Sequence, residues 1–460
     1  MIKGTGIVLM AVIWSILGTS FSFAQKKVWT LKECIDYAME NNVDVLSNEI
    51  DTEIAAVNEQ QSKLNYIPAV SANIGYNINT GRALDPTTYQ YTENQVVNNM
   101  NAAVGASSVL LAGLQKYHNV RKSQREHLAA IQDFQRFKND MSLNIAMYYL
   151  EVLYNKELVV TLEKQVESSQ ENIDRMEKLV NAGTATVGEL LDMEAQKANE
   201  EYSLVDGQSK LSISILNLCQ LLEISDTENF DVEVPDIAQL ADIFPKESVG
   251  EIYQIALRLP EIEAAKLRVE SAEYDIKIAK AKLYPSLNFN FGYSSAFSDS
   301  RQMPVITSAG LQYQKYKFWD QIRDNAGTSI SFGLSIPILN SFSARKGVKL
   351  AELSKRKAEY AVRNAELKLF KDVKQAHTDA LGALSKFDAA LKRVKANQES
   401  IKYMEEKFRL GTASVTDYNI ARNNLLIAQS QMLQAKYDYI FKVKVLEFYK
   451  GIPIGLEPIR

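Results

Sequence analysis

Two long stretches without proline constrain the fold more than any other feature of this 460-residue chain. Residues 114–182 contain no internal glycine either, and residues 342–410 contain only Gly347 and Gly382. Proline and glycine are the usual helix breakers, so each stretch predicts one continuous helix. Such a helix is on the order of 100 Å long, which exceeds the diameter of a compact domain. The chain is therefore predicted to build a rod or coiled-coil-like architecture.

An apolar residue recurs every seven positions along both stretches, which is typical of helices that wind around neighbours. The recurring residues are Ile145, Val152, Val159, Val166, Ile173 and Val180, and then Val373, Ala380, Phe387, Val394, Ile401 and Phe408. Each residue of the second set lies 228 positions after its counterpart, and the same offset relates Gly183-Thr184 to Gly411-Thr412. We therefore predict one unit duplicated, each copy running helix, strand, loop, strand, long helix, turn and return helix.

Four windows carry no charged residue, although charged residues make up 23% of the chain: residues 64–81, 94–115, 283–298 and 325–344. Inside them, apolar residues alternate with Ser, Asn and Gly, which is the period of a β-strand. A small, uncharged polar side fits a membrane-spanning strand whose other side faces lipid. The alternative, four half-buried strands of a soluble sheet, accounts for the alternation alone about equally well.

On the membrane interpretation, the polar side of each strand lines a pore. The predicted pore-lining residues are Ser71, Asn73, Asn77, Asn101, Asn288, Asn290, Ser331 and Ser335. Four strands cannot close a barrel, and an open sheet edge cannot face hydrocarbon. Several chains must then contribute to one barrel.

Residues 1–24 have the features of a secretory signal peptide, with Lys3 before an apolar core at residues 7–17 and small residues at Ser22 and Ala24. The formal net charge of −4 disfavours a nucleic-acid partner. Two cysteines and three histidines leave little material for a metal site, and either a free or a bonded state of Cys34 and Cys219 is open. None of the nucleophile, phosphate-binding, zinc-protease or dinucleotide motifs occurs, so we expect no catalytic residues, no cofactor and no enzyme.

The duplicated order of elements, the Gly-Thr turns at 183 and 411, and the helix-to-strand Tyr-Xaa-Pro at Tyr66, which corresponds to Leu283-Tyr284-Pro285 in the second copy, resemble the TolC family of outer-membrane efflux proteins. The resemblance covers essentially the whole mature chain. It implies an α+β membrane protein in which three chains contribute four strands each to one 12-stranded barrel in outer-membrane lipid, with long helical hairpins forming a tube in the periplasm. It further implies a homotrimer whose partners are a periplasmic adaptor protein and an inner-membrane pump.

The expected organisation follows from the offsets. Repeat 1 spans residues 25–235, a linker spans 236–247, and repeat 2 spans 248–460. The expected strands are about 69–79, 97–111, 286–297 and 327–339, the long helices are 114–182 and 342–410, and the return helices are 186–224 and 414–450.

The helical turns supply the other site candidates. Gly183 and Gly411 each end a long helix, and Thr186 with Glu189 and Ser414 with Asp417 predict capping boxes that open the return helices. The resemblance implies that Gly183, Thr184, Gly411 and Thr412 contact the adaptor. Helix termination alone would also explain the glycines.

The resemblance makes Asp417 a candidate for the periplasmic gate, because it matches a family aspartate at the closed entrance. Glu189 and Asp192 occupy the corresponding region of the first repeat, and helix capping is an equally good explanation of these acids. Ile420 and Ala413 stand where family members carry a second aspartate and an arginine, so an acidic ring and a salt-bridge lock are both doubtful here.

Residues 298–324 carry Tyr313, Tyr316, Phe318 and Trp319, and we expect an external loop with aromatics at the membrane interface. A loop-packing cluster is the alternative. Residues 80–95 are expected to form the other external loop.

The sequence thus predicts a passive outer-membrane duct of an efflux or type I secretion system. A periplasmic adaptor or coiled-coil scaffold is the alternative from another class, and it ranks lower because an adaptor has one helical hairpin between soluble β-domains. No sequence pattern identifies the pump class or the exported substrate.

Overall fold

The computed structural model describes residues 27–84, 91–235 and 247–456, so the expected leader at 1–24 and nearly all of the expected linker at 236–247 lie outside the described residues. The described chain is mostly helical with some strands, as expected. It divides into two compact units, and each unit takes segments from both halves of the sequence. Of the described residues, the first unit comprises 27–50, 134–235, 247–260 and 366–456, and the second comprises 51–84, 91–133 and 261–365. Within the described ranges, no helix has the length and apolarity to cross a membrane.

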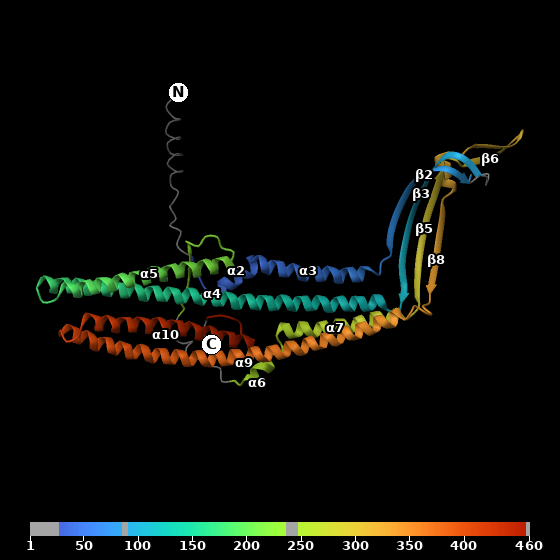
Figure 1. Ribbon diagram of the computed structural model, residues 1–460. Helices are drawn as coiled ribbons and strands as arrows, with labels where there is room; N and C mark the ends of the chain where they lie inside the picture. The colour runs from blue at the N-terminus through green and yellow to red at the C-terminus, as the bar shows by residue number, and fades with distance from the viewer. Residues whose placement is uncertain (1–26, 85–90, 236–246, 457–460) are drawn as a thin grey trace, which may run out of the picture. The chain divides into compact units, whose positions relative to one another are not determined.

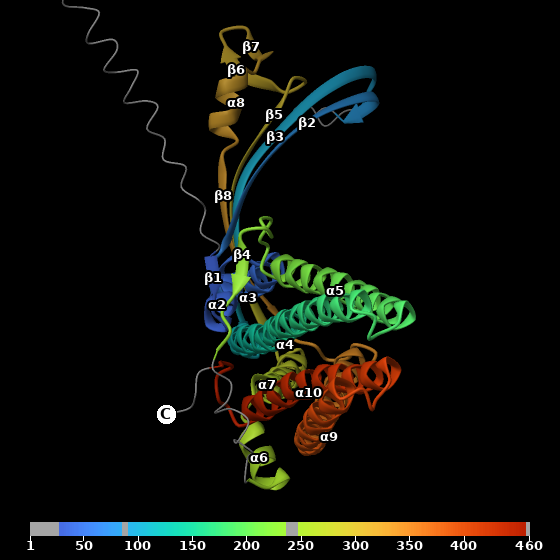
Figure 2. The ribbon, with the colours of Figure 1, turned by 90° about the vertical axis from the view of Figure 1, so that its left-hand side faces the viewer.

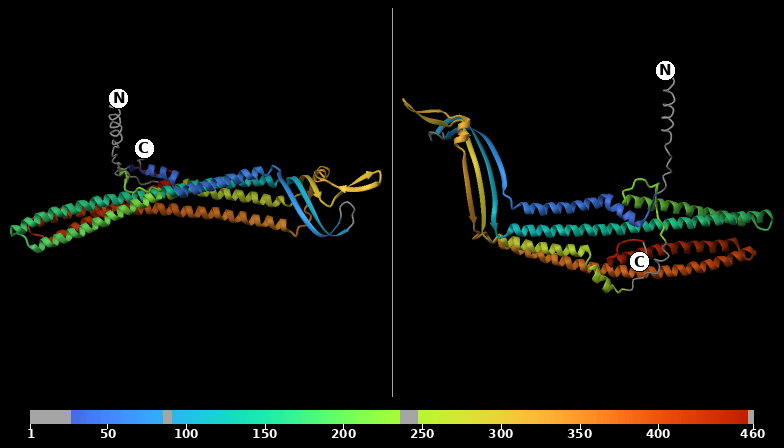
Figure 3. Two further views of the ribbon diagram at one scale, coloured as in Figure 1. Left: turned by 90° about the horizontal axis from the view of Figure 1, so that it is seen from above. Right: turned by 180° about the vertical axis from the view of Figure 1, so that it is seen from behind.

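Two helical hairpins dominate the first unit. In the first hairpin the long helix α4 (Gln115–Asn181) is followed by α5 (Val187–Leu221), and in the second α9 (Ser343–Arg409) is followed by α10 (Val415–Tyr449). The long helices are 67 residues each and the return helices 35 residues each. Figure 3 shows the two hairpins side by side, with their turns at the same end. Part of the predicted seam is fully buried, at Ile145, Val152 and Val373, and near the turns Ile173 packs in one cluster with Val180, Ile401 and Phe408.

Short elements complete the first unit. They are β1 (Lys27–Trp29), α2 (Leu31–Asn41), β4 (Phe230–Val232) and α6 (Val249–Ala256). β1 pairs with β4 in parallel, and the buried Tyr149 hydroxyl donates to the carbonyl oxygens of Trp29 and Glu233 at 3.0 and 2.8 Å. These bonds fasten the first described residues to α4.

Cys34 and Cys219 lie in the hydrophobic core of the first unit, and both are free thiols. Burial raises the pKa of Cys34 to about 12 and that of Cys219 to about 11. Both behave as small core residues, because burial in apolar surroundings keeps a thiol protonated.

A four-stranded antiparallel sheet forms the distinctive part of the second unit. Its strands are β2 (Ala69–Leu84), β3 (Tyr91–Ala112), β5 (Ser286–Ser298) and β8 (Gly327–Ser335), arranged in the order β2-β3-β5-β8 (Figure 1). Helices α3 (Val43–Leu64) and α7 (Pro260–Ala281) lead into β2 and β5. Each of these helices ends just before the proline that precedes its strand, Pro68 or Pro285.

Three strand boundaries differ from those expected: the end of β2, the start of β3 and the end of β8. β2 and β3 continue through most of residues 80–95, so the expected loop there is much shorter. The charge-free criterion cut these strands too early, because the pairing of β2 with β3 continues past the charged residue Arg82. β8 ends at Ser335 and not near residue 339, because Pro337 has no N–H to donate to a sheet.

The segment between β5 and β8 has structure of its own. A hairpin, β6 (Gln302–Thr307) and β7 (Gly310–Lys315), is followed by the short helix α8 (Phe318–Asp324). Figure 2 shows both at the end of the sheet away from α7.

A buried polar cluster joins the two hairpins of the first unit. Glu200 of α5 accepts hydrogen bonds from Gln165 of α4 at 3.1 Å and from the hydroxyl of Ser169. Arg422 of α10 lies 3.8 Å from the Glu200 carboxylate and donates to the Gln165 carbonyl at 3.1 Å. Glu200 and Arg422 are both buried, so the cluster ties α10 to α4 and α5 in a medium where a charge needs its partner.

We expect Arg422→Met to destabilise the protein by about 3–5 kcal/mol, because it leaves the buried Glu200 carboxylate without its cation. The matched control is Arg409→Met, which removes an arginine from an exposed pair with Glu406 and should cost no more than about 1 kcal/mol. Denaturant unfolding followed by helical circular dichroism measures both. Equal losses of unfolding free energy in the two variants would show that the buried cluster stabilises the protein no more than an exposed ion pair does.

Candidate functional site

The register of the sheet places the alternating apolar residues of all four strands on one face. Val104 of β3 lies opposite Ala72 of β2 and Tyr293 of β5, and Phe289 lies opposite Phe332 of β8 with ring centroids 5.3 Å apart. Members of this face are Val70, Ala72, Ile74, Tyr76, Met100, Val104, Leu287, Phe289, Phe291, Tyr293, Ile330, Phe332 and Leu334. We call it the apolar sheet face.

The opposite face carries small uncharged side chains. Asn290 lies between Ser107 of β3 and Ser331 of β8, and Gly105 lies between Ser71 and Gly292. All eight residues predicted to line a pore belong to this face: Ser71, Asn73, Asn77, Asn101, Asn288, Asn290, Ser331 and Ser335. The structure brings them together on one side of a single sheet, with lengths of strand suited to a bilayer.

Much of the apolar sheet face is open in the described chain, although Phe318 of α8 packs at its Phe297 end. Ile74 is 77% exposed and Phe332 is 64% exposed. Contiguous exposed apolar surface of this extent marks a site of contact with lipid or with another molecule. At roughly 25 cal/mol per Å² of apolar surface, leaving this face in water would be costly.

The two hairpin turns of the first unit have the same geometry. Gly183 and Gly411 have φ of 73° and 70°, a left-handed conformation that costs an L-residue about 1–2 kcal/mol. The Thr184 N–H and hydroxyl both donate to the Leu179 carbonyl, at 2.9 and 3.0 Å, and Thr412 does the same to Lys407 at the same distances. Helix termination therefore accounts fully for these glycines and threonines within one chain.

The acidic gate candidates begin the return helices. Glu189 forms the predicted capping box with Thr186, and these hydrogen bonds hold the pKa of Glu189 below its usual value. Asp417 donates its N–H to the Ser414 hydroxyl, and that hydroxyl donates to its carboxylate at 2.7 Å. In the first hairpin the Glu189 carboxylate also accepts from the Thr186 backbone N–H. The start of α10 has only the side-chain cap from Ser414, because the Asp417 side chain is one methylene shorter than Glu. Asp192 is exposed on α5.

A cluster near the turns joins the two hairpins, and sequence analysis did not single it out. Tyr418 of α10 stacks on Phe408 of α9 with ring centroids 5.1 Å apart, and Asn172 of α4 donates to its hydroxyl at 3.2 Å. Tyr418 packs with Ile173, Met176, Met193 and Val415. Together with Arg422, it holds α10 against the first hairpin close to the acidic candidates.

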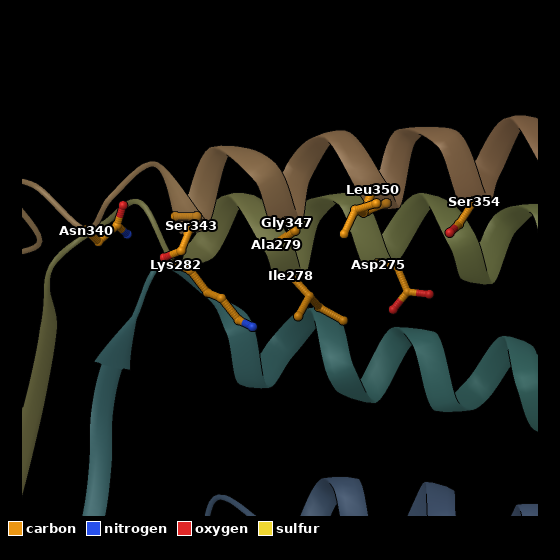
Figure 4. Close-up of a pocket in the computed structure, with 11 residues that line it drawn as sticks. Asp275, Ile278, Ala279, Lys282, Asn340, Ser343, Gly347, Leu350 and Ser354 are labelled. Atoms are coloured by element: carbon orange, nitrogen blue, oxygen red, sulfur yellow. The ribbon is translucent and has the colours of Figure 1, made fainter.

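An open groove lies between α7 and α9 (Figure 4). Its volume is about 510 Å³, and small residues such as Ala279, Ser343 and Gly347 line it. Of its charged side chains, Asp275 already pairs with Lys122 at 2.8 Å. The described residues contain no group of three His, Cys, Asp or Glu side chains placed to hold a metal ion.

Comparison with known proteins agrees with this architecture. The family model described as "Outer membrane efflux protein" matches residues 34–222 and 252–449. The outer membrane protein TolC of Vibrio cholerae is 22% identical over 433 residues, covering 90% of each chain. The alkaline protease secretion protein AprF of Pseudomonas aeruginosa is 18% identical over 412 residues, covering 86% of this chain and 81% of that protein.

Solved structures show the same fold at low identity. CusC superposes with a TM-score of 0.74 at 16% identity, covering 94% of this chain and 95% of that one. The open state of the MtrE outer membrane channel of Neisseria gonorrhoeae gives a TM-score of 0.71 at 17% identity, covering 94% and 93%. The expected resemblance is thus confirmed, and the chain belongs to the outer membrane efflux protein family.

Proposed function

We propose that this protein is a passive duct, in which the apolar sheet face lies against outer-membrane lipid and the Ser/Asn/Gly face lines a water-filled lumen. The observation that carries the proposal is the sheet register, which places the large apolar side chains mainly on one face and the Ser, Asn and Gly residues mainly on the other. Small uncharged lumen residues discriminate little between solutes, so specificity resides in a partner pump of the inner membrane that does the work.

Closure of the lumen requires further copies of the chain. β2 and β8 are the two edge strands, and each has one side without a strand partner in the described chain. The four strands alternate in direction, so β8 of one copy can continue antiparallel onto β2 of the next. We propose a homotrimer, in which the four strands of each copy build a shared 12-stranded barrel.

Exposed apolar residues on two helices of the second unit support this assembly. On α3, Ile54 and Val57 are exposed, and on α9, Leu350, Leu353 and Tyr360 are exposed at helical spacing. These helices lead into β2 and out of β8, the two edge strands. Contact between α3 of one copy and α9 of the next would bury both stripes.

The equal lengths of α4 and α9, and of α5 and α10, support an origin by duplication, with repeat 1 at 25–235 and repeat 2 at 248–460. In this proposal the turns at Gly183-Thr184 and Gly411-Thr412 dock a periplasmic adaptor protein. Asp417, Glu189 and Asp192 lie near the turns and would surround the gate. The relatives found are named as channel, efflux and export proteins, which supports a role without catalysis.

Docking at the turns predicts that Gly183→Asn with Gly411→Asn abolishes efflux while the protein still assembles. Asn tolerates the left-handed conformation, and no atom lies within 4 Å of the added Cβ at either position, so the turns should persist. The control is Gly451→Asn at the end of α10, where φ is 76° and the space is equally open. Efflux is measured with the cognate pump and adaptor. Normal efflux in the double variant would show that the turns are not the docking site.

A gate at Asp417 predicts that Asp417→Asn changes conductance or cation block of the purified protein in planar bilayers. Asn keeps an oxygen that accepts from the Ser414 hydroxyl, so the helix start is retained while the charge is lost. Asp438→Asn, an exposed aspartate further along the same helix, is the control. Unchanged conductance and block in Asp417→Asn would exclude it from the gate, and failure of the parent protein to conduct would contradict the duct itself.

A further inference from the structure

The two faces of the hairpin formed by β6 and β7 differ in polarity. Residues that pair directly in an antiparallel ladder share a face, and here Ile306 pairs with Leu311 and Pro304 with Tyr313. One face therefore carries these four apolar or aromatic side chains in a block. The other face includes Gln312, Gln314 and Thr307 beside Met303 and Val305.

The apolar block of the hairpin is open to its surroundings. Ile306 is 86% exposed and Leu311 is 59% exposed, and Trp319 on the adjoining helix α8 is 77% exposed. A lone two-stranded hairpin is at best marginally stable in water, and a contiguous apolar block on it marks a contact surface.

The segment is firmly attached to the sheet. Gln321 of α8 is fully buried, and its amide donates to the carbonyls of Ser298 and Tyr316 at 2.8 and 3.0 Å while accepting from the Ser298 N–H at 3.0 Å. The Ser295 hydroxyl donates to the Ile322 carbonyl at 2.7 Å. These bonds hold α8, the helix that carries Trp319, against the end of β5.

Aromatic contacts connect the apolar sheet face with Trp319. Phe297 lies on the same face of β5 as Tyr293, because the strand alternates without a bulge against β8 and Phe297 pairs with Met100. The Phe297 ring lies 4.9 Å from that of Phe318, and Phe318 lies 5.0 Å from Trp319. The segment is thus continuous with the apolar sheet face and not with the Ser/Asn/Gly face.

Basic side chains adjoin the apolar block. Lys315 pairs with Gln302 at the base of the hairpin, Lys317 precedes α8, and both are exposed. Apolar and aromatic residues flanked by lysines are typical of segments that lie in the headgroup layer of a bilayer.

We propose that the β6–β7 hairpin and α8 form an interfacial foot, which lies in the headgroup layer of the surrounding lipid. Pro304, Ile306, Leu311, Tyr313 and Trp319 face the acyl chains, while Lys315 and Lys317 contact lipid phosphates. The inference rests on the proposed lipid contact of the apolar sheet face. The foot is a lipid-binding element outside the sheet. It is not a lid over the lumen, because α8 contacts the apolar sheet face and not the Ser/Asn/Gly face.

Tryptophan fluorescence tests the foot directly. The chain has three tryptophans: Trp14 in the expected leader, Trp29 in the core at 8% exposure, and Trp319. The mature Trp29→Phe protein, assembled in vesicles of phosphatidylcholine and phosphatidylglycerol, therefore reports on Trp319 alone. Brominated acyl chains should quench most of the Trp319 emission, and aqueous iodide should quench little. Quenching by iodide and not by bromine would overturn the foot.

A second reporter separates failure of the foot from failure of the proposed function. Trp29→Phe/Trp319→Phe/Phe332→Trp places the single tryptophan on the apolar sheet face of β8. Bromine quenching of this reporter without quenching of Trp319 would overturn the foot and keep the sheet in lipid. Loss of quenching at both would overturn the proposed sheet orientation as well.

The lysines are tested by lipid charge. Trp319 quenching should be stronger in vesicles with phosphatidylglycerol than in phosphatidylcholine alone, and Lys315→Gln/Lys317→Gln should remove that difference. Lys402→Gln on α9, an exposed lysine in the first unit, is the control. A lipid-charge effect that survives the double substitution would overturn the phosphate contact.

Discussion

The backbone hydrogen bonds at the edges of a four-stranded sheet are the constraint on which the rest of the protein depends. β2 and β8 each present a row of N–H and C=O groups on one side, and the sheet carries an apolar face that is largely open in the described chain. In lipid, each unpaired backbone group costs several kcal/mol. A chain of this kind reaches a low free energy only when another strand continues each edge. The proposed trimer supplies those strands, and the exposed apolar stripes on α3 and α9 would be buried by the same contacts.

Within one chain, polar contacts tie together helices whose apolar seams alone would permit sliding. The Glu200 and Arg422 cluster joins α10 to the first hairpin, and Tyr418 adds a hydrogen bond to Asn172 nearer the turns. A buried charge pair gives little net stability but penalises any arrangement that separates its members. Such contacts fix the register of α10 on α4 and α5 next to the acidic residues proposed for the gate.

The long helices, the alternation of the strands and the turn glycines could be predicted because each depends on local chemistry. Proline-free heptads define α4 and α9, and the period-two pattern assigns Asn290 and Phe289 to opposite faces. The predicted end of β2 and the predicted start of β3 were wrong, because the backbone hydrogen bonding of these strands continues past charged residues. The Glu200 cluster was not predicted, because it is built from three helices that are far apart in sequence. One sequence signal could have indicated it: the buried residues Met193, Glu200, Gly207 and Ser214 recur every seven positions, so that Glu200 places a charge at a core position. The fold of residues 302–324 left no clear period, because its stability comes from Gln321 and from contacts with β5.

Counting the chains in the detergent-extracted assembly tests the central claim most directly. Native mass spectrometry of the protein, released gently from membranes, should give a mass three times that of the same chain measured after denaturation. A shared barrel of three copies predicts that this species alone conducts in bilayers. A conducting species with the mass of a single chain would contradict the account, because four strands would then have to span the membrane with both edges unpaired.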